Sequence, residues 1–423
     1  MDSTPDAISP SPKVLWPQVW GLAAVQGAIA LTWVIYNLYL PGLLTNLGLA
    51  ASLATGLLIL ENGIGILMEP LMGSFSDRTQ QWVGSRFPFI ALGIILASVL
   101  FLLIPIVSGL VLALPQDQIH TGLLQSLKWL FVLVLVAWAL AMTIFRSPAL
   151  SLLGRYAFSS QMPQAASILT LVGGLAGALG PLASQVILGM GEFATFTLGA
   201  IVLLVAAQVL RSVGPQRQVT EPQPYQQNGF SPSPTAAISW PGLALVFGAG
   251  VGIALGFRLL MQSFPQILET QVIGAPTGLI LGGIFLSLAL TAIPSGWVAT
   301  YLGNTLAMIL GLVVMAGLLG FTLYVTHPLG AALIAVGLGA SFSLVSNGTI
   351  PFALTMVSQS RAGLGTGIFF SGGALASSLF GSLVSQPEAM AASTGAIAGA
   401  AAFLAAGICI AFSGPFQLPK ASA

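Results

Sequence analysis

The sequence predicts an all-α integral membrane protein in which twelve transmembrane helices form two related six-helix bundles. The prediction rests on composition, on the spacing of the apolar runs and on one polar segment near the middle. Hydrophobic residues make up 56% of the 423 residues and charged residues only 5%, and the mean hydropathy is +0.97. A soluble domain has about 25% charged residues, so we expect a lipid bilayer to surround this chain.

Apolar runs of about 20 residues, the length that crosses a bilayer as a helix, occur twelve times along the chain. In chain order, the predicted spans are residues 16–40, 46–72, 88–112, 128–150, 163–189, 193–212, 241–265, 275–299, 305–326, 329–352, 363–386 and 390–413.

The polar segment from Val213 to Ser239 is rich in Gln, Pro and Ser. Such a composition cannot bury a core and is typical of a flexible linker. Trp16 and Pro70 recur as Trp240 and Pro294 at one common offset, which favours duplicated halves with a site between them. The predicted organisation is a cytoplasmic tail (1–15), a first bundle (16–212), a cytoplasmic linker (213–239), a second bundle (240–413) and a cytoplasmic tail (414–423).

The positions of Lys and Arg predict the orientation. If both termini are cytoplasmic, most of these residues fall at the inner face, whereas Lys128 falls at the outer face and Arg258 lies inside the seventh span. This asymmetry follows the positive-inside rule. We therefore expect a multi-pass protein of the plasma (inner) membrane with both termini in the cytoplasm.

Several classes of function have no support in the sequence. The net charge of +1 gives no reason to expect nucleic acid as a partner. No phosphate-binding loop is present, and His120 and His327 belong to no metal-binding pattern. We expect a protein that is no enzyme, has no cofactor or metal and works as a monomer.

Residues 73–90 (GSFSDRTQQWVGSRFPFI) form a charged segment between two apolar runs, which we interpret as a loop. Asp77 and Arg78 follow Gly73, and Gly84 and Arg86 follow in turn. The spacing resembles the loop between helices 2 and 3 of major facilitator transporters. Its longer form, through Pro88-Phe89-Ile90, resembles the sucrose–proton symporters, the glycoside–pentoside–hexuronide cation symporter group and their bacterial relatives.

This resemblance implies the major facilitator fold and a role for the segment in gating. In that fold, the acid in the position of Asp77 reaches toward the start of helix 11, which falls near Ala362 and Gly363 in this sequence. Such a latch holds the cytoplasmic side shut in one state and opens in the other. The alternative interpretation is an ordinary turn whose basic residues reflect only membrane topology.

The resemblance extends to the fourth and fifth spans. Arg146-Ser147-Pro148 is similar to the Arg-Thr-Pro segment of the sucrose symporter group, and Gly173-Gly174 matches the start of its helix 5. That group commonly has an Asp after the Arg-Thr-Pro segment, where this chain has Arg155. Proton coupling through the usual residue of the group is therefore in doubt.

Charged residues at bilayer depth are costly, and most are functional. At 1.5 Å per residue, Glu61 lies about 18 Å from Gly73 and Arg258 lies about 24 Å from Gly242. The similar depths predict a Glu61–Arg258 pair that lines the cavity, with Glu61 as the candidate proton acceptor. The alternative is a static pair that fixes helix packing.

Two further charged residues lie nearer the inner face. Arg146 is a candidate for binding substrate oxygens, because its guanidinium offers a planar set of donors; the alternative is that it extends to the lipid headgroups. Glu69 is expected to be a local partner of Arg78 or Arg86.

Polar and aromatic side chains suggest a solute site. Gln26, Trp33 and Asn37 share one face of the first span, and Gln262 and Asn347 lie in the seventh and tenth spans. Amides beside a flat indole suit a sugar. The alternative is hydrogen bonding between helices, which is common in membrane bundles.

The function predicted from the sequence is that of a secondary active transporter that moves a small polar solute, a sugar or glycoside, by alternating access. Proton coupling stays open. One alternative is an exporter of amphipathic compounds or a pigment-delivery type of major facilitator protein. An alternative from another class is a membrane scaffold or sensor that does not transport.

Overall fold

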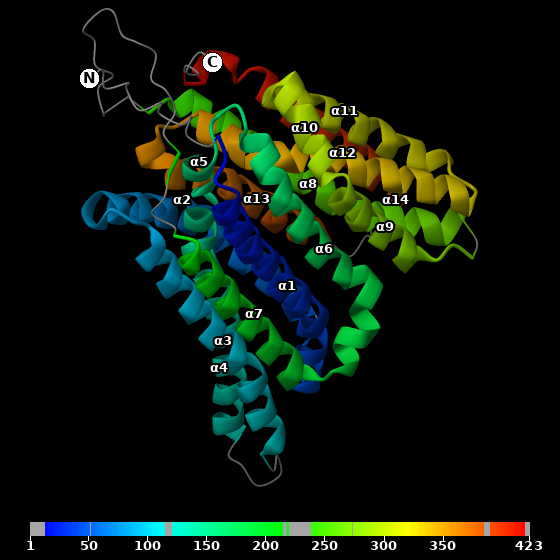
Figure 1. The fold of residues 1–423 in the computed structure, drawn as a ribbon. Helices are drawn as coiled ribbons and strands as arrows, with labels where there is room; N and C mark the ends of the chain where they lie inside the picture. The colour runs from blue at the N-terminus through cyan, green and yellow to red at the C-terminus, as the bar shows by residue number, and fades with distance from the viewer. Residues whose placement is uncertain are drawn as a thin grey trace, which may run out of the picture.

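The computed structural model consists almost entirely of long helices. It describes residues 13–50, 52–114, 121–214, 218–219, 238–272, 274–384 and 390–418. The first half contains α1 (Trp16–Asn46), α2 (Ser52–Val83), α3 (Phe87–Ala113), α4 (Thr121–Leu150), α5 (Leu153–Tyr156), α6 (Met162–Gly189) and α7 (Glu192–Ser212). The second half contains α8 (Trp240–Gln271), α9 (Thr277–Leu290), α10 (Ala292–Leu302), α11 (Asn304–Phe321), α12 (Pro328–Thr355), α13 (Ala362–Val384) and α14 (Ala392–Ala411). Figure 1 shows their arrangement.

Eleven stretches of the described chain are long and apolar enough to span a membrane, and α9 with α10 makes a twelfth if this bent pair counts as one span. The two helices of the pair are bent by 53°. Pro294 lies just after the break, and a proline has no N–H to donate to the carbonyl group four residues earlier, here that of Leu290. The predicted number and order of the spans therefore agree with the structure when the bent pair counts as one span.

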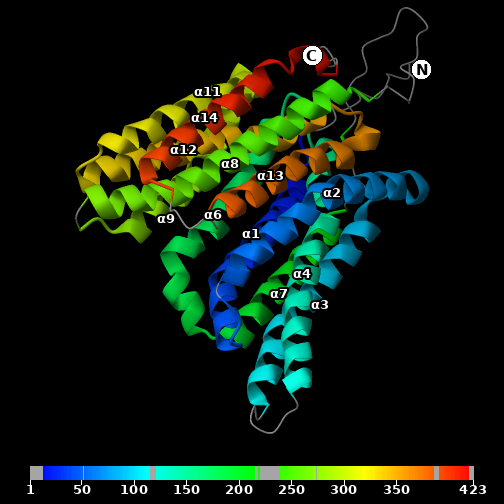
Figure 2. The same cartoon turned by 180° about the vertical axis from the view of Figure 1, so that it is seen from behind.

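The helices form two bundles that meet at one end and diverge at the other. The helices α1–α7 lie in one bundle and α8–α14 in the other (Figures 1 and 2). Each has its own hydrophobic core: one core is formed mainly by residues 14–210 and the other by residues 246–410. The bundles meet near α5 and diverge toward the tips of the α3–α4 hairpin and of α9 (Figures 1 and 2).

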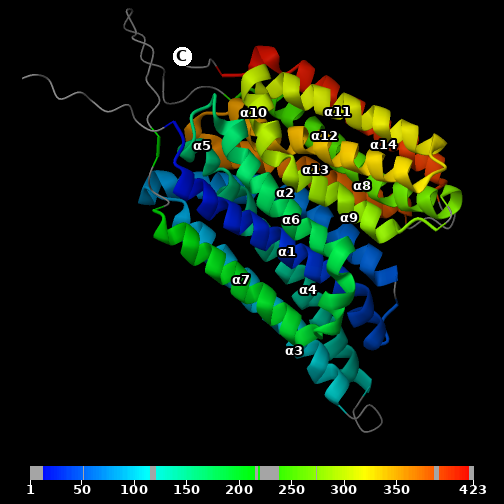
Figure 3. The same cartoon turned by 45° about the vertical axis from the view of Figure 1, so that its right-hand side comes forward.

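Two sets of contacts join the bundles. The helix α2 packs along α13, and α6 lies between α1 of its own bundle and α9 of the other (Figure 3). Close approach of α2 and α13 requires glycine on both sides. A Cβ atom on Gly73 would overlap the carbonyl oxygen of Gly363, and one on Gly363 would overlap that of Gly73. Small residues allow this backbone-to-backbone packing in membrane bundles.

The prediction of a loop at residues 73–90 was wrong over much of its length, because α2 continues to Val83 and α3 begins at Phe87. Only residues 84–86 connect the two helices. Gly84 ends α2 with a φ of +77°, a conformation that glycine adopts without strain. The polarity of residues 74–83 marked the exit from the apolar environment and not the end of the helix.

Parts of the predicted tails and linker, residues 1–12, 215–217, 220–237 and 419–423, lie outside the described residues. Residues 218 and 219 are described, and the N–H of Val219 donates to the carbonyl oxygen of Arg155 at 2.8 Å. This end of the linker therefore contacts the first bundle. The domain boundaries given above stay predictions.

Candidate functional site: a cavity between the bundles

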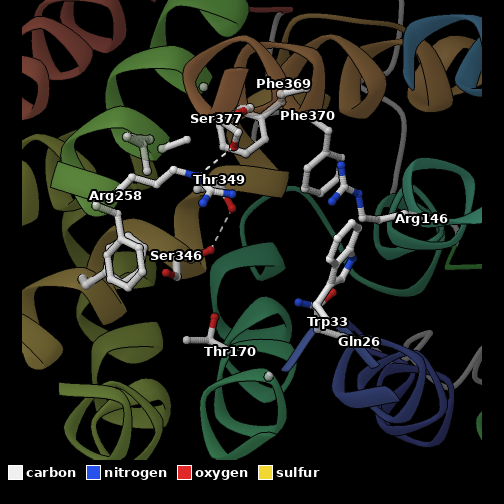
Figure 4. A pocket seen from close by; sticks show the side chains of 18 of the residues that line it. Gln26, Trp33, Arg146, Thr170, Arg258, Ser346, Thr349, Phe369, Phe370 and Ser377 are labelled. Carbon is white, nitrogen blue, oxygen red and sulfur yellow. Dashed lines mark hydrogen bonds between the residues drawn. The ribbon is translucent and has the colours of Figure 1, made fainter. Parts of the chain in front are cut away.

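A cavity of about 740 Å³ lies between the two bundles. Its walls come from α1, α2, α4 and α6 of the first bundle and from α8, α9, α12 and α13 of the second. The volume falls within the range of small-molecule sites. Figure 4 shows side chains from both bundles converging on this space.

Most of the predicted solute-binding residues lie in this one cavity. The residues that line it include Gln26, Trp33, Asn37, Arg146, Arg258 and Gln262. Glu61 and Asn347 are not among the lining residues. The lining shows where these side chains lie, and their roles in binding stay predictions.

Arg258 does not pair with Glu61, so that prediction was wrong. Its Nε–H group donates to the Ser377 hydroxyl at 2.8 Å. The centre of the guanidinium lies 5.9 Å from the ring centroid of Phe380. Figure 4 shows the terminal nitrogens of Arg258 directed into the cavity, across from the side that holds Arg146 and Trp33.

Glu61 faces α1 instead. The Tyr36 hydroxyl donates to its Oε1 atom at 2.6 Å, and the carboxyl group is buried. The buried side chains of α2 recur about every fourth residue, and Glu61 belongs to this packed face together with Gly65, Glu69 and Gly73. The prediction used the axial rise alone, and the position of a residue along the axis does not fix the direction of its side chain around that axis. The next residue, Asn62, lines the cavity.

An aromatic cluster connects Glu61 to the cavity wall. The ring of Trp33, which lines the cavity, lies 5.7 Å from that of Tyr36 and 5.0 Å from that of Trp138, measured between centroids. Tyr36 and Trp138 are 4.5 Å apart. Tyr36 therefore contacts the indole at the cavity wall and also holds the Glu61 carboxyl group.

Arg146 forms an ion pair with Glu69, which is fully buried. The expectation that Arg78 or Arg86 would pair with Glu69 was wrong. The centre of the Arg146 guanidinium lies 4.6 Å from the ring centroid of Phe370, a cation–π contact. This arginine thus faces the cavity with its charge already balanced.

Asp77 bridges the two bundles at the end where they meet, as the resemblance implied. Its two carboxylate oxygens each accept a hydrogen bond at 2.9 Å from a backbone N–H, one from Gly363 and one from Leu364. Both residues lie in the first turn of α13, whose N–H groups have no partner within the helix. The positive end of the helix dipole further favours the carboxylate.

Arg86 is fully buried and completes this bridge. One of its terminal nitrogens pairs with Asp77 and also donates to the Gln359 carbonyl oxygen at 3.4 Å, and the other donates to the Ser151 hydroxyl at 3.0 Å. Burial lowers the pKa of the Arg86 guanidinium, and the charge of Asp77 opposes that shift. Arg78, by contrast, is exposed.

Ser147 adds a second tie between α4 and α13 that the sequence did not reveal. Its hydroxyl donates to the Gly363 carbonyl oxygen at 3.0 Å, and the Thr366 hydroxyl donates to the Ser147 carbonyl oxygen at 3.1 Å. The sequence pattern gave Ser147 only as part of a family-like segment. We call Asp77, Arg86, Ser147, Gln359 and Gly363 the latch.

Asn347 was predicted to belong to the solute site, but it does not line the cavity. It is fully buried, and its side-chain amide donates to the Ala292 carbonyl oxygen at 2.8 Å. Ala292 follows the break between α9 and α10, where regular helical bonding is interrupted. The amide therefore stabilises the bend.

Sequence reasoning also missed the aromatic part of the lining. Phenylalanine is frequent throughout this chain, with 23 residues, so no local pattern distinguishes those at the cavity. Six of them line it: Phe257, Phe285, Phe342, Phe369, Phe370 and Phe380. Only the packing of the helices reveals this group.

Comparisons with known proteins agree with this architecture. None of the curated proteins compared matches the chain in sequence. The fold is similar to a bacterial homologue of the iron transporter ferroportin in an outward-facing state, with a TM-score of 0.73 and 14% identity over 94% of this chain and 99% of that one. It is also similar to the human organic anion transporter MFSD10 (TETRAN), with a TM-score of 0.62 and 13% identity over 93% of this chain and 98% of that one. At such identities, the likeness concerns the fold alone.

The sequence itself provides the assignment to a family. The family model of the Major Facilitator Superfamily matches residues 22–381, which include α2, the latch and every residue that lines the cavity. The twelve-span architecture and the cavity between two bundles accord with that match. The chain therefore belongs to the Major Facilitator Superfamily of membrane transporters.

Proposed function

We propose that this chain is a secondary transporter that moves a small organic solute across the membrane by alternating access. The observation that carries the proposal is a cavity lined by both bundles, together with the latch contacts that join the bundles at the end where they meet. A site built from both bundles changes its access when the bundles rock against each other. The latch supplies a set of contacts present in only one of the two states.

The orientation predicted from the basic residues indicates which side of the membrane the open end of the structure faces. With both termini cytoplasmic, the latch closes the cytoplasmic side and the bundles diverge toward the outside. The structure then corresponds to an outward-facing state of a monomer in the plasma (inner) membrane.

Two solute classes fit the cavity. A sugar or glycoside, the class favoured by the sequence and by its resemblance to sucrose–proton symporters, would use the amides of Gln26, Asn37 and Gln262 beside the Trp33 indole. An amphipathic compound is favoured by the six phenylalanines. One structural neighbour is described as an organic anion transporter, which accords with the second class.

We assign proton coupling to Glu61. Its carboxyl group is buried and bonded to Tyr36, with no cation paired to it in the described part of the chain. Burial disfavours a charged carboxylate without a counter-charge, so a neutral, protonated form fits this environment. Because Tyr36 contacts Trp33, occupation of the cavity and protonation of Glu61 share a physical connection.

Transport is tested with purified protein in liposomes. Uptake of radiolabelled sucrose and maltose and of a neutral aromatic glycoside is measured with and without an imposed pH gradient, for the wild type and for Glu61→Gln. Saturable uptake of any of the three supports the proposal, and loss of the gradient effect in Glu61→Gln assigns coupling to that residue. Uptake that ignores the gradient in the wild type contradicts proton coupling.

Alternating access is tested without any substrate. In a Cys409→Ser background, Ser346→Cys places one thiol in the cavity. A membrane-impermeant thiol reagent is added to either side of oriented vesicles. We expect labelling from both sides at different rates; labelling from one side only, even when the latch is weakened by Asp77→Asn, contradicts alternating access.

A further inference from the structure

We propose that the solute is an organic anion with a flat apolar body, and that Arg258 binds its anionic group while the phenylalanines of the second bundle hold its body. This inference rests on the proposed transport function and names the substrate class of the same cavity. It differs from the sugar predicted by the sequence, which needs no fixed positive charge.

Among the residues that the structure describes, no acid balances the charge of Arg258. The structure describes five acidic residues, Glu61, Glu69, Asp77, Glu192 and Glu269, and its two ion pairs join Arg86 to Asp77 and Arg146 to Glu69. Arg258 therefore differs from the other two arginines at this interface. An uncompensated charge at membrane depth is costly, and a bound anion removes that cost.

The guanidinium is fixed in position but keeps free donors. Its Nε–H is used by Ser377, and the Ser377 hydroxyl in turn donates to the Gly373 carbonyl oxygen at 2.9 Å. The remaining N–H groups point into the cavity (Figure 4). A planar guanidinium held in this way suits two parallel hydrogen bonds to a carboxylate, sulfonate or phosphate group.

Aromatic side chains line the same cavity as this donor group. The ring of Phe257, the residue before Arg258, stacks on that of Phe342 with centroids 4.5 Å apart and planes 15° apart. Phe285 meets the Phe257 ring edge-on at 5.9 Å. Aromatic walls of this kind favour flat apolar groups, so the anionic group and the body of one molecule can be held together.

The ion pair between Arg146 and Glu69 limits the charge that the solute can carry. Arg146 faces the same cavity, but Glu69 already neutralises it. The cavity therefore presents one uncompensated positive charge among its described residues. A monoanion matches this charge, whereas a dianion would leave one negative charge unbalanced in the bilayer.

The test uses a matched pair of probes, radiolabelled 2-naphthoate and its neutral amide 2-naphthamide, with the purified full chain in detergent. The variants are Arg258→Gln, Arg258→Lys and the control Arg211→Gln, which removes an exposed arginine outside the cavity. Thermal unfolding verifies that each variant is folded. We expect naphthoate to bind more tightly than the amide, and Arg258→Gln to weaken it about 10- to 100-fold, the loss typical of a charged hydrogen bond.

The remaining variants sharpen the result. Arg258→Lys keeps the charge but loses the planar donor pair, so we expect a weakening smaller than that of Arg258→Gln. Arg211→Gln is expected to bind like the wild type, and none of the variants to change binding of the amide. This separates a role in anion binding from a structural role of Arg258, which would affect both probes.

Equal affinity for both probes, unchanged binding of naphthoate by folded Arg258→Gln, or no binding of naphthoate by folded wild type would each overturn the anion proposal. None of these results depends on transport. The labelling of Ser346→Cys from both sides tests alternating access separately, so the failure of one proposal can be told from the failure of the other.

Discussion

Replacing Asp77 with Asn removes the charge at the centre of the latch while keeping the size of the side chain. The carboxylate accepts two backbone hydrogen bonds from α13 and pairs with the buried Arg86. An Asn side chain has one oxygen to accept with, and its NH₂ group faces a second N–H donor. Arg86 is left buried without its counter-charge.

The expected cost follows from these contacts. A hydrogen bond to a charged group contributes about 1.5–3 kcal/mol, and breaking a buried ion pair costs about 3–5 kcal/mol. These two costs overlap, because both concern the carboxylate of Asp77. In Asp77→Asn, the closed state loses the hydrogen bond and the ion pair, whereas the open state contains neither interaction. A conservative net of about 3 kcal/mol changes the ratio of closed to open states by roughly 100-fold.

Spin labels measure this population directly. Trp82 at the end of α2 and Tyr301 at the end of α10 are 84% and 90% exposed, so labels there leave the packing intact. Distances between the labels are measured in a Cys409→Ser background, in the wild type and in Asp77→Asn. We expect the variant to gain a population with a longer distance at this end.

Arg211→Gln serves as the control, because it removes an exposed charge that belongs to no latch contact. Its distance distribution should match that of the wild type. Identical distributions for Asp77→Asn and the wild type would refute the reasoning, since the latch would then contribute nothing to the balance between the two states.

Three further predictions follow from other contacts. Gly73→Ala should open the same end, because its Cβ overlaps the backbone of α13, and spin-label distances detect this; an unchanged distribution would mean that α2 and α13 shift without cost. Glu61→Gln should abolish accumulation driven by a pH gradient but preserve counterflow exchange in liposomes, and Tyr36→Phe should weaken accumulation less, since the carboxyl group remains. Asn347→Ala should lower the free energy of unfolding by about 1–3 kcal/mol through the carbonyl group left unbonded at the helix break, visible as a lower melting temperature with probe binding retained.

The one-dimensional properties of the chain were predictable from the sequence. Hydrophobic length and the positions of polar segments gave the spans, because a helix in a bilayer must satisfy its own backbone hydrogen bonds over a set thickness. The resemblance to major facilitator transporters, which Gly73, Asp77 and Arg86 carry, implied the contact of Asp77 with the start of α13 that the structure contains.

The pairing of side chains across helices needed the tertiary structure. Glu61 and Arg258 do not meet, although the axial rise alone predicts similar depths for them, because position along a helix does not fix which neighbour a side chain faces. Helix packing also decided three other features that the sequence did not predict. Glu69 pairs with Arg146, Asn347 lies at the break between α9 and α10, and six phenylalanines line the cavity.

The sequence by itself therefore determined that this is a membrane protein with up to twelve helical spans and a charged segment after the second span. Only the tertiary structure decided which arginine keeps an uncompensated charge in the cavity and which carboxyl groups are neutralised. The physical reason is that hydrophobicity is a property of each residue along the chain, whereas charge compensation is a property of pairs that form only when helices from both bundles pack together.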